Sequence, residues 1–318
     1  MKALTSPNKD TPLAWLELSD LPLRPDQVRI EVQAAGVNPV DWKMRQGDFL
    51  GVVQRVIGPR GPLVVGVDVA GVVREVGAAV TDLAPGDRVV AGTDFSKGER
   101  GSYAAMAQVL AQNCCKLPDS VPFDVAGALP VAGVTAQMAL FEVAKLQPGT
   151  PAKVLVLGAS GGVGHMAVQL ARNAGFAVVG VCSTRNAALV ARLGAQVLDY
   201  AKVDVAAEAA KLGPFDLVVN AVGSASYPTA MTKKLLAKGG TLVLVVPGAA
   251  DLLDMLLPGP VRTVLARPNR ARLAPLVEAI AAGKLEVVID QRIPLAEAER
   301  AHQFSQGGKV VGKLVLVA

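Results

Sequence analysis

Gly158-Ala159-Ser160-Gly161-Gly162-Val163-Gly164 is the stretch of sequence that decides the fold. The apolar run 153–157 before it is typical of a buried parallel strand, and the apolar residues of 165–172 after it recur at helical spacing. Glycines let the backbone approach a pyrophosphate, and the amino end of the following helix stabilises its negative charge. The alternative is a purely structural turn. The predicted dinucleotide contacts within the turn are Ser160, Gly161, Gly162 and Val163.

The end of the next apolar run, 177–182, indicates which dinucleotide binds. A site for NAD usually has Asp or Glu there to hold the ribose 2′-hydroxyl, but this chain has Ser183-Thr184-Arg185-Asn186. Hydroxyls and a guanidinium suit a 2′-phosphate. A solvated helix N-cap formed by Ser183 or Thr184 is the alternative, and both roles can hold at once. The sequence therefore predicts NADPH as the cofactor, with Ser183 and Arg185 at its phosphate.

Composition sets further limits. The chain has 318 residues, enough for two domains, and 51% of them are hydrophobic but only 4% aromatic, so Val, Leu and Ala build the core. The net charge of +5 is spread along the chain without a basic block, which argues against nucleic-acid binding. Three cysteines make no disulfide framework. Since no long apolar run and no signal-peptide core occur, we expect no membrane span and a cytoplasmic location.

The secondary-structure pattern changes along the chain. Before about residue 122 it indicates short strands and turns; afterwards strands and helices alternate, which predicts a doubly wound parallel sheet. The strands predicted for this sheet are 153–158, 177–183, 197–200, 215–221 and 240–246. The tail has a predicted helix near 271–282 and a predicted strand at 287–289, followed by a helix near 295–304 and a strand at 313–317. Because this mixed tail does not extend a parallel sheet, we expect it to return to the first domain. The predicted domains are 1–122 with 267–318, and 123–266.

Several motifs occur together in one order. They are 35–43 (AGVNPVDWK), 66–77 (GVDVAGVVREVG), 86–89 (GDRV), 101–104 (GSYA), 129–136 (LPVAGVTA), the glycine turn, 193–200 (LGAQVLDY) and 312–315 (GKLV). In this combination the chain resembles the medium-chain dehydrogenase/reductase superfamily. The resemblance implies an α/β fold in which a GroES-like catalytic domain is interrupted by a Rossmann domain with its doubly wound parallel sheet.

The residues at the zinc positions of that superfamily indicate the branch. Zinc alcohol dehydrogenases have Cys where this chain has Asn38, and His-Glu where it has Val67-Asp68. Valine has no donor atom for a metal, and asparagine is a poor zinc ligand. The cysteines of a structural zinc lobe are absent from 91–113. The chain thus resembles the zinc-free, zeta-crystallin-like quinone oxidoreductases, with no metal ligands, which reduce quinones or activated alkenes with NADPH.

The resemblance also implies roles for single residues. Without a Lewis acid the small-molecule substrate must already be electrophilic, a quinone or an α,β-unsaturated carbonyl. Asn38 is expected near the nicotinamide or the substrate carbonyl, with Asp41 and Asp68 holding its loop. Lys43 is expected to donate to an oxyanion, or else to be a solvated lysine. Tyr103 is expected to line the cleft, or else to pack in a strand.

Further cofactor contacts follow from the same resemblance. Thr135 is expected near the nicotinamide amide, with a helix N-cap as its alternative role, and Tyr200 beside the adenosine phosphate. Two further strand ends meet the cofactor edge of a doubly wound sheet. The contacts expected there are Val222, Gly223, Val245 and Pro247.

Residues 261–265 predict a sixth strand at the sheet edge and, through its pairing, a homodimer. Two other functions remain open: a tailoring enoyl or ketone reductase for one natural product, with a pocket shaped by 44–62 and 247–260, and a non-catalytic NADPH-binding scaffold.

Overall fold

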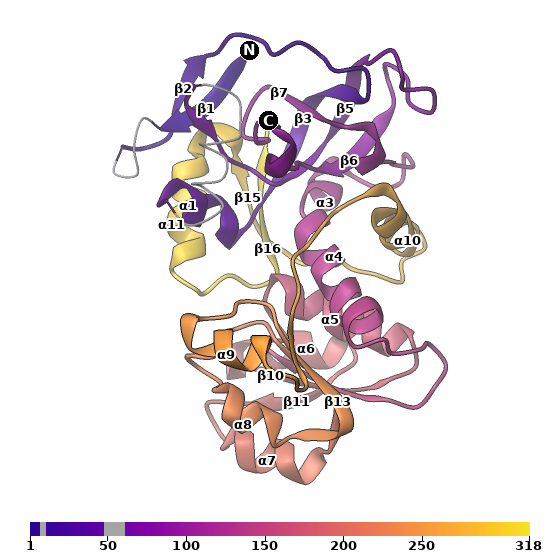
Figure 1. The fold of residues 1–318 in the computed structure, drawn as a ribbon, viewed down its shortest axis with the longest axis vertical. Helices are drawn as coiled ribbons and strands as arrows, with labels where there is room; N and C mark the ends of the chain where they lie inside the picture. The colour runs from indigo at the N-terminus through magenta and orange to yellow at the C-terminus, as the bar shows by residue number, and fades with distance from the viewer. Residues whose placement is uncertain (7–10, 48–60) are drawn as a thin grey trace. The chain divides into compact units, whose positions relative to one another are not determined.

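A computed structural model describes residues 1–6, 11–47 and 61–318 (Figure 1). The chain folds into two compact units, which we describe separately. Unit 1 comprises Met1–Val131, Arg267–Gly283 and Ile289–Ala318; unit 2 comprises Ala132–Ala266 and Lys284–Val288.

The division differs from the predicted boundaries at two places, for reasons of packing. Helix α3 (Phe123–Gly127) lies against unit 1, where a Cβ added to Gly127 would meet the Ala34 Cβ at 2.9 Å. Residues 284–288, by contrast, return to unit 2, because the Gln169 side chain and the Glu286 backbone exchange two hydrogen bonds of 2.9 and 2.8 Å. Val287 and Val288 are consequently not part of the predicted strand, which begins only at Ile289.

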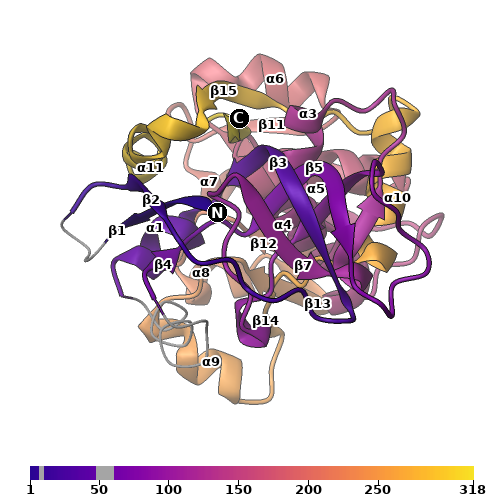
Figure 2. The same ribbon diagram turned by 90° about the horizontal axis from the view of Figure 1, so that it is seen from above.

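Unit 1 is built on a seven-stranded sheet with the order β15-β16-β3-β5-β6-β8, in which β7 also pairs with β3. The strands are β3 (Gln27–Val37), β5 (Asp68–Val76), β6 (Arg88–Gly92), β7 (Met106–Leu110), β8 (Cys114–Lys116), β15 (Ile289–Pro294) and β16 (Lys313–Val317). Strand β16 pairs antiparallel with β3, so the tail completes this sheet. Figure 2 shows β3 and β5 side by side.

A smaller sheet and several helices complete unit 1. The sheet has the order β2-β1-β4. These elements are β1 (Lys2–Ser6), β2 (Ala14–Glu17), β4 (Leu63–Val64), α1 (Pro39–Arg45), α10 (Arg270–Ala281) and α11 (Ala298–Gln306), with 3₁₀ turns at Phe95–Lys97, Ala111–Asn113 and Leu295–Glu297. The core between sheet and helices is mostly aliphatic, and Ile30, Val69 and Leu316 are fully buried in it.

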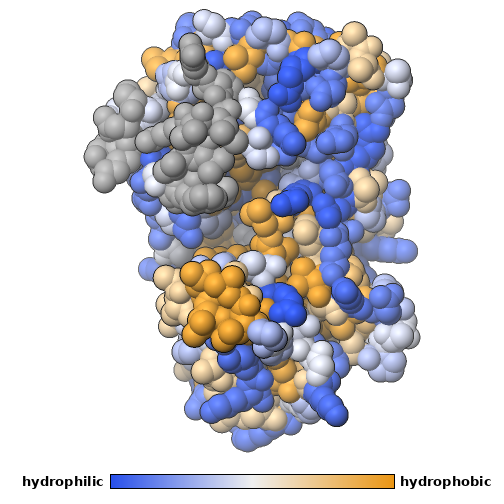
Figure 3. Space-filling view, viewed as in Figure 1, coloured by the Kyte–Doolittle hydropathy of each residue, from blue (hydrophilic) through white to orange (hydrophobic). Residues whose placement is uncertain are grey.

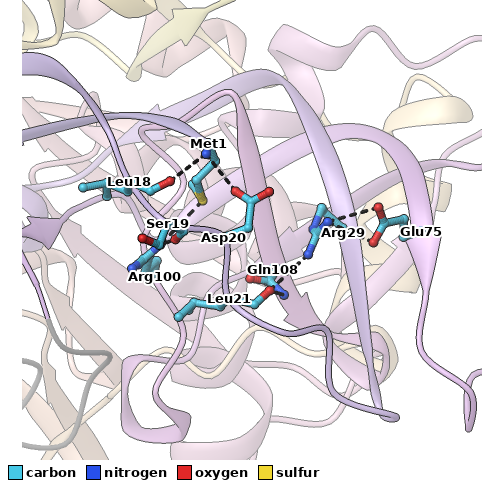
Figure 4. A network of polar contacts seen from close by, with 9 residues as sticks. All are labelled: Met1, Leu18, Ser19, Asp20, Leu21, Arg29, Glu75, Arg100 and Gln108. Carbon is cyan, nitrogen blue, oxygen red and sulfur yellow. Dashed lines mark hydrogen bonds and ion pairs between the residues drawn. The ribbon is translucent and has the colours of Figure 1, made fainter.

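Polar contacts fasten the segment after β2 to the rest of unit 1 (Figure 4). The amino group of Met1 donates to the Leu18 carbonyl and the Asp20 carboxylate, each at 2.7 Å. Arg29 donates to the Leu21 carbonyl at 3.1 Å. These bonds satisfy backbone groups of a stretch that has little regular structure of its own.

Unit 2 is a six-stranded parallel sheet with the order β11-β10-β9-β12-β13-β14. The strands are β9 (Lys153–Leu157), β10 (Ala177–Cys182), β11 (Gln196–Asp199), β12 (Phe215–Asn220), β13 (Leu236–Leu244) and β14 (Val261–Thr263). The predicted doubly wound sheet is confirmed, since this order places the first strand in the middle and reverses beside it. Buried Val and Leu on β9 and β12 account for the aliphatic composition.

Helices connect these strands. They are α4 (Pro130–Gln137), which starts at the boundary and continues as a π-helical segment Met138–Val143, then α5 (Gly162–Asn173), α6 (Ala187–Arg192), α7 (Val205–Leu212), α8 (Thr229–Lys233) and α9 (Leu252–Leu256), with 3₁₀ turns at Thr184–Asn186 and Ala249–Asp251. Among the helices of the described residues, none has the length and apolar character needed to cross a membrane.

Candidate functional site

The glycines of the turn after β9 have different tasks. Gly158 has φ +81°, which suits glycine, and a Cβ on Gly164 would lie 2.0 Å from the Gly158 carbonyl oxygen. Gly161, the N-cap of α5, has φ −83°, and a Cβ there would meet only the Gly158 oxygen, at 3.4 Å. Gly158 and Gly164 therefore form the turn, whereas Gly161 leaves space open beside the amino end of α5. That end, with its backbone N–H groups, fits a pyrophosphate.

Side chains support the turn from two sides. The His165 ring contacts the Gly161 carbonyl through Nδ1 at 2.9 Å, while Nε2 accepts a hydrogen bond from the Val288 N–H at 3.2 Å. This pattern assigns the proton of the neutral ring to Nδ1, and both ring nitrogens are engaged by the backbone, which gives His165 a structural role. The Ser160 hydroxyl accepts a hydrogen bond from the Asn186 side chain at 2.9 Å.

The predicted 2′-phosphate residues lie at the ends of β10 and β11. Arg185 and Tyr200 are exposed and Ser183 is partly exposed. The Thr184 hydroxyl does not cap a helix; it donates to the Asp199 carboxylate at 2.5 Å, and this hydrogen bond lowers the pKa of Asp199.

Asp199 brings a carboxylate to the edge of the sheet where the sequence analysis found Ser183-Thr184-Arg185-Asn186 in place of an acidic residue. The sequence argument considered only the residues that follow β10. Strand β11 runs parallel beside it, with Asp199 in register with Cys182. The signal was present in the sequence as the acidic end of the next predicted strand.

The ends of β12 and β13 are shaped by Asn220, which the sequence analysis did not single out. Its side-chain oxygen accepts hydrogen bonds from the N–H groups of Val222 at 3.1 Å and Gly223 at 2.9 Å. Its carbonyl accepts one from the Val245 N–H at 3.0 Å. Val222 and Pro247 are exposed at these strand ends. The sequence held a signal for this role, because an asparagine at the end of an apolar run commonly forms hydrogen bonds to the backbone of the turn that follows.

Thr135 lies within helix α4, five residues after its first residue, Pro130, and is 4% exposed. The alternative role as an N-cap is therefore wrong, because a cap residue stands before the first turn.

In unit 1, Asn38 belongs to a buried polar cluster at the start of α1. Its side-chain Nδ2 donates to Asp68 at 2.8 Å, its Oδ1 accepts from the Lys313 ammonium at 2.5 Å, and its backbone N–H donates to Asp41 at 2.7 Å. The Asn38 side chain is 3% exposed. Both amide atoms are thus held in one orientation.

Lys313 and Asp68 carry the charges of this cluster. The Lys313 ammonium lies 3.5 Å from the Asp68 carboxylate, and the Val131 N–H donates to the same carboxylate at 2.8 Å. Burial raises the pKa of Asp68, although the Lys313 charge opposes this shift. Sequence reasoning missed Lys313, whose signal was a lysine at the start of the apolar run 313–317.

Tyr103 takes part in the same cluster without reaching the surface. Its side chain is fully buried, although the residue belongs to none of the named strands. Its hydroxyl donates a hydrogen bond to the Asp41 carboxylate at 3.2 Å. Burial raises the pKa of Asp41 to about 7. The Tyr103 ring centroid lies 5.6 Å from that of His302, whose pKa burial lowers to about 4. Asp41 therefore links Tyr103 with Asn38 in a buried hydrogen-bond network.

Lys43 is not part of these contacts. It is partly exposed on α1, and its ammonium lies 5.5 Å from the centroid of the Trp42 ring. The structure thus brings Asn38 and Tyr103 together through Asp41 but leaves Lys43 outside the cluster.

The positions of metal ligands in zinc relatives are unsuited to a metal here. Val67 is 8% exposed and has no donor atom, and the Asn38 amide is held by Asp68 and Lys313. Across residues 1–6, 11–47 and 61–318, no group of three or more His, Cys, Asp or Glu side chains is arranged to hold a metal ion. Two segments were predicted to shape a substrate pocket. Of the first, 44–62, residues 48–60 lie outside the described residues, whereas the second, 247–260, contains α9.

Comparison with known proteins matches two parts of the chain to protein families. Residues 24–119 match the family "Alcohol dehydrogenase GroES-like domain", and 193–316 match the family "Zinc-binding dehydrogenase". A chloroplast envelope quinone oxidoreductase homolog of Arabidopsis thaliana is 34% identical, over 95% of this chain and 94% of its own length.

Solved structures agree with this assignment. The quinone oxidoreductase from Coxiella burnetii has a TM-score of 0.87 at 28% identity, covering 100% of this chain and 98% of its own. The mycobacterial protein Rv1454c, solved in complex with NADPH, has a TM-score of 0.82 at 28% identity, with 100% of both chains covered. With Asn38 and Val67 in place of zinc ligands, this chain belongs to the medium-chain dehydrogenase/reductase superfamily, in its zinc-free quinone oxidoreductase branch, and is an oxidoreductase.

Proposed function

We propose that this protein reduces quinones or the activated C=C bond of α,β-unsaturated carbonyls with NADPH and without a metal ion. The observation that carries the proposal is the open position at Gly161, beside the amino end of α5. In the same turn, Gly158 and Gly164 are required by backbone geometry alone, whereas Gly161 is not. The backbone at Gly161 does not require glycine, but a pyrophosphate that approaches the amino end of the helix closely would leave no room for a side chain there.

The choice of NADPH rests on the side chains at the ends of β10 and β11. Arg185 and Tyr200 are exposed there, and a guanidinium recognises phosphate through paired N–H donors. The opposing charge of Asp199 is engaged by the Thr184 hydroxyl and the Ala201 N–H, and Lys202 lies 3.6 Å from its carboxylate. These contacts reduce its repulsion of a 2′-phosphate.

The substrate class follows from the missing Lewis acid. Bound NADPH supplies a hydride, and a carbonyl that no metal polarises accepts it poorly, whereas quinones and enones are electrophilic in themselves. The proposed role of Asn38 is to orient the nicotinamide or the substrate carbonyl. Because Lys313 and Asp68 already fix the Asn38 amide, this side chain loses little conformational freedom when the substrate reacts. We also propose that Lys43 donates a hydrogen bond to the oxyanion formed in the reaction, and that Thr135 lies near the nicotinamide amide.

Consumption of NADPH with a panel of simple quinones and enones tests this function. We expect turnover with several members of the panel. Turnover of only one bulky compound would support a tailoring reductase instead, and NADPH binding without any turnover would support a scaffold.

We further propose a homodimer that covers the β14 edge of the unit 2 sheet. Strand β14 pairs only with β13 in the described sheet, and leucines in α9 and directly after it, shortly before β14 in the chain, form an exposed apolar patch (Figure 3). The patch is formed by Leu252, Leu253, Leu256 and Leu257, which are 53–74% exposed. A second copy would remove this apolar surface and the free edge from water. A cytoplasmic location stays a prediction of the sequence, which cell fractionation tests.

A further inference from the structure

Asp251 is a buried carboxylate that joins two loops of unit 2. It ends the 3₁₀ turn before α9 and is 2% exposed. Its Oδ1 accepts a hydrogen bond from the Thr229 hydroxyl at 2.6 Å. Its Oδ2 accepts two, from the Ser224 hydroxyl at 2.6 Å and from the Gly248 N–H at 2.7 Å. Although burial raises its pKa, these hydrogen bonds lower the pKa of Asp251 below its usual value, so it is charged at neutral pH.

The donors come from the carboxyl ends of neighbouring parallel strands. Ser224 follows Gly223 in the loop after β12, and Gly248 follows Pro247 in the loop after β13. These are the loops for which the sequence predicted cofactor contacts. Asp251 thus fixes the spacing between the two loops with one side chain.

The strand order indicates which half of a dinucleotide these loops face. The sheet reverses between β9 and β12, and a doubly wound sheet binds the two halves of a dinucleotide on either side of that point. The glycine turn, Arg185 and Tyr200 belong to the side of β9, β10 and β11. The loops joined by Asp251 therefore belong to the nicotinamide half.

The basic shape of the β12 loop does not depend on Asp251. Asn220 independently holds the N–H groups of Val222 and Gly223 at the root of that loop. The bonds of Asp251 are made beyond the strand ends, to Ser224, Thr229 and Gly248, and none of them is part of the sheet ladder. Its removal should alter the loops while leaving the sheet intact.

We propose that Asp251 is a positioning residue for the nicotinamide half of the cofactor, holding the loops after β12 and β13 at the spacing that binds it. The inference deepens the proposed function and rests on it. It assigns Asp251 no contact with the cofactor itself. Because the adenine half is bound on the other side of the sheet reversal, Asp251 should affect only ligands that carry the nicotinamide.

The experiment compares two ligands on matched variants. Titrations with NADPH and with adenosine 2′,5′-bisphosphate, which lacks the nicotinamide, are made on wild type, Asp251→Asn and Asp254→Asn. Asp254 lies on the adjacent helix α9 and pairs with Lys233 at 2.6 Å, outside the two loops. We expect Asp251→Asn to raise the Kd for NADPH about ten- to hundredfold and to leave that for the bisphosphate unchanged, because amide nitrogen replaces an acceptor. Asp254→Asn should change neither.

An equal rise in the Kd for both ligands in Asp251→Asn, or no rise for either ligand, would overturn the inference. If Asp251→Asn does not fold, Ser224→Ala removes one of the three bonds and should still weaken only NADPH, by about threefold or more; Ser226→Ala in the same loop is its control. Unchanged NADPH binding in Ser224→Ala would then overturn it. A wild-type protein that binds neither ligand would instead refute the proposed function, and with it this inference.

Discussion

Replacing Gly161 with valine separates a cofactor-binding turn from a merely structural one. A Cβ at this position has its nearest neighbour, the Gly158 oxygen, at 3.4 Å, and the φ of −83° suits any residue. Valine is a poorer helix N-cap than glycine, which costs about 1 kcal/mol. That cost lowers the Tm by about 2–4 °C. We therefore expect Gly161→Val to fold with a nearly normal Tm, measured by circular dichroism.

Cofactor binding should respond far more strongly. The hydrogen bonds between backbone N–H groups and a pyrophosphate are charge-assisted, worth about 1.5–3 kcal/mol each. Displacing the pyrophosphate from two of them costs about 3–6 kcal/mol, which raises the Kd for NADPH by at least about a hundredfold. Fluorescence titration with NADPH measures this change.

Gly164→Ala is the matched control within the same turn. Its Cβ would lie 2.0 Å from the Gly158 oxygen, so the backbone must move and the Tm should fall further than in Gly161→Val. Wild-type affinity for NADPH in Gly161→Val would refute the reasoning, because the turn would then be structural only. A loss of Tm equal to that of Gly164→Ala would refute the description of Gly161 as open.

Other perturbations test the remaining parts of the account. Asp199→Asn should increase the preference for NADPH over NADH about three- to tenfold, since it removes a negative charge beside the expected position of the 2′-phosphate. Arg185→Ala should decrease this preference. The ratio of the Kd for NADH to the Kd for NADPH, measured for each variant, tests both expectations. Lys313→Met should destabilise the protein by about 3–5 kcal/mol in urea unfolding, because it leaves the Asp68 carboxylate buried without its cation; an unchanged midpoint would contradict this. Burial raises the pKa of Asp41 from 3.8 to about 7, so its contribution to stability is present below about pH 4 and is lost as the pH rises through about 7. Urea unfolding across that range should show this fall weakened in Asp41→Asn. If the protein forms the proposed homodimer, Leu256→Lys should yield a monomer near 32.7 kDa in light scattering, and a wild type already of that mass would reject the proposal.

Periodicity predicted the parallel sheet well because buried parallel strands are continuous apolar runs. The strand predicted at 153–158 is Lys153–Leu157, and the one predicted at 177–183 is Ala177–Cys182. Strand β13 starts earlier than predicted, at Leu236 instead of 240, since Gly239 with φ +83° interrupts the pattern without ending the strand.

Contacts between distant residues were beyond reach of the sequence. Lys313 and Asn38 are 275 positions apart, and only the pairing of β16 with β3 brings them within 2.5 Å. The sequence analysis did not single out Asp251, because two of its three donors, Ser224 and Thr229, lie 27 and 22 positions before it, beyond the end of another strand. Local patterns predict which backbone surrounds a site, but side-chain networks depend on tertiary packing.

Initial rates of NADPH oxidation by a simple benzoquinone, measured at 340 nm with and without chelator, test the central claim most directly. The account predicts saturable turnover that chelation leaves unchanged, with slower turnover from NADH at equal concentration. Turnover abolished by the chelator and restored by zinc, or no oxidation of NADPH by any quinone or enone despite tight NADPH binding, would contradict it.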